Sequence, residues 1–135
     1  MRQALAATAV FVTLAAAAAA NGATSTLPGT YTTKLSGKTP AVVNGEWAIQ
    51  IKRNGDYVIL KRISKTEGKG EVRGKALLNP GRVVTFTKES GPLACKVTGK
   101  YHWTIKGGKT LTFQRLHDTC AGRRVVLSGT FKKVA

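Results

Sequence analysis

Acidic side chains are scarce in this sequence, which has six Asp and Glu residues against 22 Lys and Arg residues. None of the six forms a spaced pair of the kind that acid–base catalysis uses. Histidine and cysteine are also rare, with two of each, and their spacing is not that of a zinc finger. No glycine-rich phosphate-binding motif precedes a helix. These absences predict a protein that is not an enzyme and that uses no cofactor and no metal.

Long hydrophobic runs are missing except at the N-terminus, where Met1-Arg2 precedes an alanine-rich stretch that ends at Ala20. A basic residue, an apolar run and small residues are typical of a secretory signal peptide. A membrane anchor is the alternative, but alanine is weakly hydrophobic and the run is short for a span. We expect a secreted protein with no stable membrane span after processing. Its predicted parts are a signal peptide (1–20), a flexible leader (21–28) and one domain (29–135).

The two cysteines are Cys95 and Cys120. In an exported chain, two cysteines indicate one disulfide, and two free thiols are the alternative. His117-Asp118 beside Cys120 has the residue types of a Cys–His–Asp catalytic site. A disulfide in a turn next to a surface histidine explains the same residues, and we favour that interpretation.

Helical periodicity is missing after the N-terminal run, and a β-hairpin over residues 45–63 is the clearest pattern. Apolar and more polar residues alternate along its first arm, where the apolar ones are Trp47, Ile49 and Ile51. Asn54-Gly55 is a strong turn signal because both residues tolerate a positive φ. A three-residue loop places Ile51 opposite Tyr57 and gathers the apolar residues on one face.

Short β-rich segments separated by turns continue to the end of the chain. They predict eight strands: residues 29–35, the two arms of the hairpin, and residues 71–78, 82–88, 95–105, 111–115 and 123–134. Short connections make neighbours in sequence neighbours in the sheet. The predicted fold is therefore all-β, an eight-stranded antiparallel up-and-down barrel. A β-sandwich is the alternative, and it needs a long crossing connection for which residues 36–44 are the candidate.

Two local motifs and the overall plan resemble the lipocalin-like small barrels of the calycin group. Gly45-Glu46-Trp47 matches the Gly-x-Trp that opens an early lipocalin strand, and Arg123 or Arg124 matches the arginine that packs over that tryptophan. Residues 99–127 also resemble bacterial secreted lipocalin-like proteins of unassigned function. The resemblance implies structural roles for Gly45, Trp47 and Arg123, with Arg123 over Trp47 at one end of the barrel. The alternative is an ion pair between Arg123 and Asp118.

Two kinds of function agree with this barrel. The first is a binding module that carries a small apolar ligand inside the barrel, and its predicted lining is Tyr31, Trp47, Ile49, Tyr57, Phe86, Tyr101, Trp103 and Phe113. The same residues would simply fill a small barrel if it has no cavity. A protease-inhibitor-like barrel is a further possibility by analogy of fold alone.

The second kind of function uses the exterior, because the formal net charge is +16. An anionic surface or polymer is the expected partner of outward-facing basic residues. These are Lys34, Lys52, Arg73, Lys75, Lys100, Lys106, Lys109, Arg115, Lys132 and Lys133. Specific nucleic-acid binding is not expected, because the aromatic residues face inward instead of forming a stacking platform between the basic ones.

Overall fold

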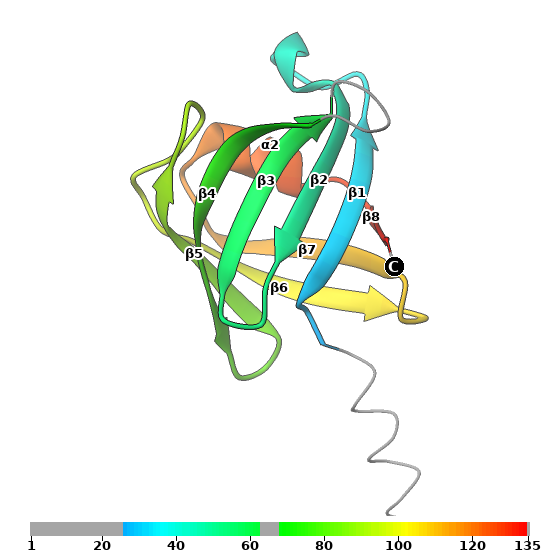
Figure 1. Ribbon diagram of the computed structural model, residues 1–135, viewed down its shortest axis with the longest axis vertical. Helices are drawn as coiled ribbons and strands as arrows, with labels where there is room; N and C mark the ends of the chain where they lie inside the picture. Colours follow the sequence, from blue (N-terminus) through cyan, green and yellow to red (C-terminus); the bar gives the residue numbers. More distant parts are fainter. Residues whose placement is uncertain (1–25, 63–67, 135) are drawn as a thin grey trace, which may run out of the picture.

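The computed structural model describes residues 26–62 and 68–134, which form a closed barrel of eight antiparallel strands in sequence order (Figure 1). The strands are β1 (Gly29–Leu35), β2 (Gly45–Ile51), β3 (Asp56–Arg62), β4 (Gly68–Asn79), β5 (Val83–Ser90), β6 (Gly99–Lys106), β7 (Thr110–His117) and β8 (Phe131–Lys133). The predicted up-and-down barrel is confirmed, and the β-sandwich alternative is wrong. The predicted signal peptide lies outside the described residues.

The central hairpin has the predicted register. Ile51 pairs with Tyr57 and Ile49 pairs with Ile59. The Lys52 N–H donates to Asp56 O at 2.8 Å, which leaves a three-residue loop in which Gly55 has φ +96°. The apolar face is buried, with no residue more than 4% exposed: Trp47, Ile49, Ile51, Tyr57 and Ile59. Burial of one face therefore selects the register that the alternation indicates.

The end of the chain differs from the prediction of one long last strand over residues 123–134. Its first part is a helix, α2 (Ala121–Leu127), and the strand β8 has only three residues. The buried residues of α2 are Arg123, Val126 and Leu127, which is the i, i+3, i+4 spacing of one helix face. Val125 and Leu127 also satisfy an alternating pattern, and a segment this short does not distinguish the two periods.

Three smaller features also correct the predictions. A 3₁₀ helix, η1 (Ala41–Val43), lies in the stretch where no helix is predicted. The strand predicted from Cys95 begins at Gly99, as β6. The end of the predicted flexible leader belongs to the fold, because Leu27 is 1% exposed and its carbonyl accepts a hydrogen bond from the Tyr31 hydroxyl at 2.7 Å. Burial of one leucine and this hydrogen bond hold the leader's last residues against the barrel.

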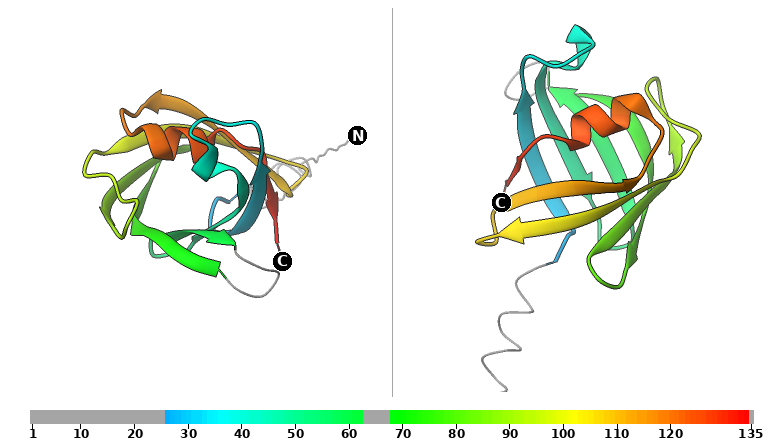
Figure 2. Two further views of the ribbon diagram at one scale, coloured as in Figure 1. Left: turned by 90° about the horizontal axis from the view of Figure 1, so that it is seen from above. Right: turned by 180° about the vertical axis from the view of Figure 1, so that it is seen from behind.

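The two helical elements lie at the same end of the barrel, where η1 and α2 contact each other (Figure 2). We call this end the mouth. It also carries the connection between β5 and β6, which includes Cys95. Within residues 26–62 and 68–134, no helix has the length and hydrophobicity to cross a membrane.

Candidate functional site

The interior of the barrel is filled by the residues that were predicted to line a ligand cavity. Seven of the eight are at most 8% exposed, and Phe113 is partly buried against them. Aromatic rings meet edge to face with centroids 5.0–6.1 Å apart, from Tyr57 through Phe86, Tyr101 and Phe113 to Phe131. Such contacts are favourable geometries for aromatic pairs and add to the stability of a packed core. Among the eight predicted residues, only Trp47 also lines the pocket at the mouth.

The mouth pocket is an apolar hollow with a volume of about 300 Å³. Its walls come from η1, from the mouth ends of three strands, and from α2, through Val42, Val43, Trp47, Ile59, Val72 and Val126. Leu93 and Cys95 complete the side next to the β5–β6 connection. The Trp47 indole N–H donates to Val43 O at 2.7 Å and so ties η1 to β2. The pocket is of the size and character of small-molecule sites.

Glu89 and Arg123 also line this pocket, and they belong to a network of buried polar groups. We call Tyr57, Glu89, Tyr101, Asp118 and Arg123 the arginine cluster. Arg123 Nε donates to Asp118 Oδ2 at 2.7 Å, and Nη2 donates to Asp118 Oδ1 at 2.8 Å. Nη2 also donates to Val97 O at 2.8 Å. The side chain of Arg123 is 3% exposed and that of Asp118 is fully buried, so this is a buried bidentate ion pair.

The other side of the guanidinium faces Glu89. Arg123 Nη1 lies 2.9 Å from Glu89 Oε2, but without the geometry of a hydrogen bond. The Tyr57 hydroxyl donates to Glu89 Oε2, and the Tyr101 hydroxyl donates to Asp118 Oδ2. The cluster therefore holds two carboxyl groups, one guanidinium and two phenols, all on buried side chains.

Burial and hydrogen bonding move the pKa values of the cluster apart. Burial by itself raises the pKa of Asp118, but hydrogen bonds from Arg123, Tyr101 and the Cys120 N–H outweigh it and hold that pKa below its ordinary value. Burial, together with the adjacent carboxylates, raises the pKa of Tyr57 and of Tyr101. Asp118 is therefore ionised and both phenols are protonated at neutral pH.

The predicted disulfide is confirmed, since Cys95 and Cys120 are bonded. It joins the β5–β6 connection to the residue that precedes α2. The backbone N–H of Cys95 donates to Glu89 Oε1 and that of Cys120 donates to Asp118 Oδ1, both at 2.9 Å. The disulfide therefore holds in place two backbone N–H groups that donate to the carboxyl groups of the arginine cluster. A disulfide is typical of proteins that fold outside the reducing cytosol.

The expected contact between Arg123 and Trp47 is not what the structure contains. Arg123 lies on α2 and its guanidinium pairs with Asp118 and Glu89, while the cation over the Trp47 ring is Lys61, with Nζ 5.9 Å from the centroid. The alternative pairing with Asp118 is thus confirmed. Gly45 opens β2 as predicted, with φ +128°, a conformation that L side chains rarely adopt.

Two parts of the site were missed by sequence reasoning. Glu89 had no assigned role, and its partner Arg123 lies far along the chain, so no local pattern joins them. Gly99 had no assigned role either, although a Cβ there would lie 2.6 Å from Asp118 Oδ2 and 2.7 Å from Arg123 Nη2. The space beside the cluster therefore requires glycine. The nearness of Asp118 and Arg123 in the sequence was the available signal for the ion pair.

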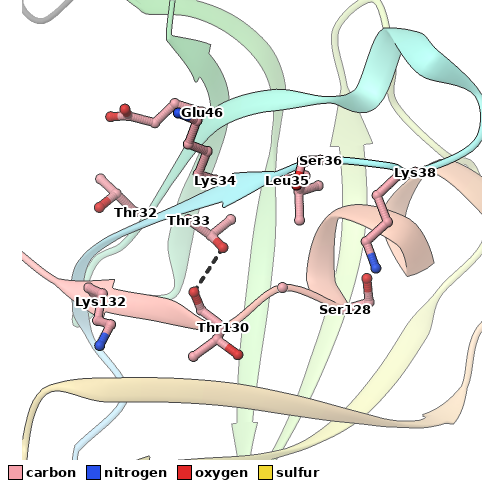
Figure 3. A pocket seen from close by; sticks show the side chains of 11 residues that line it. Thr32, Thr33, Lys34, Leu35, Ser36, Lys38, Glu46, Ser128, Thr130 and Lys132 are labelled. Atoms are coloured by element: carbon pink, nitrogen blue, oxygen red, sulfur yellow. Dashed lines mark hydrogen bonds between the residues drawn. The ribbon is translucent and has the colours of Figure 1, made fainter.

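A second hollow lies beside β1, where β8 begins (Figure 3). The chain comes from α2 and pairs with β1 from Lys132 onward, opposite Thr32. The resulting polar groove, which we call the β1–β8 groove, has a volume of about 570 Å³ and includes Lys34, Lys38, Lys132, Ser128 and Thr130. Its carboxylate, Glu46, lies 3.5 Å from Arg62 Nε. The groove therefore presents mainly positive charge and hydroxyl groups.

Comparisons of the chain with models of known protein families, with curated proteins and with solved structures found no match. The structure shows an eight-stranded antiparallel β-barrel, an architecture compatible with the lipocalin-like fold.

Proposed function

We propose that this protein is a secreted, non-enzymatic binding module of the lipocalin-like kind, which carries a small apolar ligand in its mouth pocket. The observation that carries the proposal is an apolar pocket of about 300 Å³ between η1, α2 and the strand ends. The barrel centre is packed with aromatic rings, so the mouth offers space that the centre does not. The Cys95–Cys120 disulfide and the signal-peptide pattern of residues 1–20 support secretion.

Leu93→Asp tests the pocket directly. Leu93 lines the pocket and is 54% exposed, so a carboxylate is tolerated by the fold but places charge beside the apolar ligand. We expect the affinity for the neutral probe N-phenyl-1-naphthylamine to fall about tenfold or more. Binding is followed by the fluorescence of Trp47 in a Trp103→Phe background, because the chain has two tryptophans.

Leu77→Asp is the matched control. Leu77 is 51% exposed, lies on β4 and does not line the mouth pocket, so the same change of charge is made elsewhere. We expect this variant to bind the probe as the parent does. Equal loss in both variants, or no binding by the parent, would contradict the mouth pocket as a ligand site.

A second function, binding of an anionic polymer through the exterior, is favoured by one observation. The ten basic residues that were predicted to face outward are all exposed, and two of them, Lys34 and Lys132, meet Lys38 in the β1–β8 groove. Lysines gathered around a polar groove attract anionic groups by charge, and counterion release makes such binding depend on salt.

Heparin binding measured over a range of salt tests this second function. Three groove lysines are replaced together, through Lys34→Ala, Lys38→Ala and Lys132→Ala. We expect the slope of log association constant against log salt concentration to become less negative by about 2 to 3. The control removes three exposed lysines elsewhere, through Lys52→Ala, Lys100→Ala and Lys106→Ala, at the same net charge. Equal effects would assign binding to overall charge instead of the groove, and retention unaffected by salt would argue against charge altogether.

A further inference from the structure

The arginine cluster borders the mouth pocket, so its charges and hydrogen-bonding groups indicate which functional group a ligand of that pocket carries. We propose that the ligand is a neutral molecule with an apolar body and a hydroxyl group, which accepts a hydrogen bond from Arg123 Nη1 and donates one to Glu89. The inference depends on the proposed function only in placing a ligand in this pocket. The choice of a hydroxyl depends on the donors, acceptors and charges at the pocket's polar side.

Arg123 Nη1 is buried and forms an ion pair with Glu89 Oε2 at 2.9 Å, but none of the described residues accepts a well-directed hydrogen bond from it. Nε and Nη2 face Asp118, which does not line the pocket, whereas Nη1 faces Glu89, which does. Nη1 is therefore on the pocket side of the guanidinium. An unsatisfied buried donor costs free energy, so a ligand that brings an acceptor to this point gains by satisfying it.

The charge of the cluster excludes the most obvious acceptor, a carboxylate. At their formal charges, Glu89 and Asp118 contribute two negative charges against the single positive charge of Arg123, and all three side chains are at most 3% exposed. A carboxylate ligand would add a third negative charge beside these buried groups, where repulsion is strong. A fatty acid is therefore a poorer fit than the corresponding alcohol.

An ammonium group fits the charge but not the hydrogen bonding. It would be attracted to Glu89, but it has no acceptor to offer Nη1 and would lie next to the guanidinium. A hydroxyl both donates and accepts, so it can satisfy Nη1 and Glu89 together without changing the net charge. The many exposed lysines attract anions from a distance, but salt screens them far more than it screens the buried cluster.

The test compares three ligands with one apolar body: 1-octanol, octanoate and octylammonium. Each displaces N-phenyl-1-naphthylamine from the intact protein at neutral pH and about 0.15 M salt, where exposed charges are screened beyond about 8 Å. We expect 1-octanol to bind about tenfold or more tightly than either ion, because octanoate adds a third negative charge and octylammonium offers no acceptor to Nη1.

The possible outcomes separate the two proposals. If the protein binds the probe, but octanoate or octylammonium binds as tightly as 1-octanol or more tightly, the hydroxyl inference is overturned. The pocket then remains a ligand site. Failure of the probe and of all three ligands to bind overturns the proposed function itself.

Glu89→Gln provides an independent check, because it lowers the negative charge of the cluster by one. We expect the preference for 1-octanol over octanoate to shrink to less than about threefold, since the repulsion of a third negative charge is removed. Asp56→Asn is the control, because the Asp56 side chain is 45% exposed and lines neither the mouth pocket nor the β1–β8 groove, and it should leave the preference unchanged. An unchanged preference in a folded Glu89→Gln protein contradicts the charge argument; if that variant fails to fold, the comparison of ligands on the parent protein decides.

Discussion

Replacement of Arg123 by methionine is expected to lower the free energy of unfolding by about 3–5 kcal/mol, which is the usual effect of removing one partner of a buried ion pair. Methionine keeps much of the side-chain volume but leaves Asp118 and Glu89 buried without the guanidinium that both of them contact. Urea unfolding at neutral pH, followed by tryptophan fluorescence, measures the loss.

Arg124→Met is the matched control, because Arg124 is the next residue of α2 and is exposed. A surface substitution of this kind is expected to change the stability by no more than about 0.5 kcal/mol. Similar small effects of both substitutions would mean that the arginine cluster does not stabilise the barrel.

The dependence of stability on pH gives a second signature of the cluster. The folded-state pKa of Asp118 lies below its unfolded value, so its contribution is present above the unfolded pKa and is lost as the pH falls through the folded pKa. In Arg123→Met the Asp118 carboxyl is buried without its cation, which raises its pKa instead. We therefore expect the difference in stability between parent and variant to shrink as the pH falls from neutral toward about 3. A constant difference would contradict this account.

Removal of the disulfide by Cys95→Ala with Cys120→Ala is expected to cost about 3 kcal/mol of stability, because the bond closes a loop whose ends are 25 residues apart. The bond also holds the β5–β6 connection against the start of α2, where both cysteine N–H groups donate to the carboxylates of the cluster. We therefore expect the variant to bind the apolar probe less tightly than the parent as well.

Reduction supplies the control for the disulfide. A thiol reductant should lower the midpoint of thermal unfolding of the parent toward that of the double variant, and it should not change the double variant. A parent protein whose stability and probe binding are the same with and without reductant would show that the bond holds neither the fold nor the pocket.

Local features of the sequence determined the central hairpin and the order of the strands. Asn54-Gly55 supports the positive φ of the turn, and one-sided burial selects the register that joins Ile49 to Ile59. The short connections make most strands the neighbours of the next, so the order of the strands follows from near-neighbour information. Cys95 and Cys120 are the chain's two cysteines, which is why their pairing was predictable.

The tertiary structure decided what lies at the mouth. Residues 123–127 satisfy both a strand and a helix pattern, and α2 is the outcome in which Arg123, Val126 and Leu127 share a buried face. The pairing of Arg123 with Glu89, from β5, depends on how the barrel curves and closes, which no short window of sequence contains. A buried charge takes whichever partner the fold brings within reach, because leaving it unpaired costs several kcal/mol. The scarcity of acidic residues was visible in the sequence, but the burial of Glu89 and Asp118 around a single arginine was a property of the folded chain.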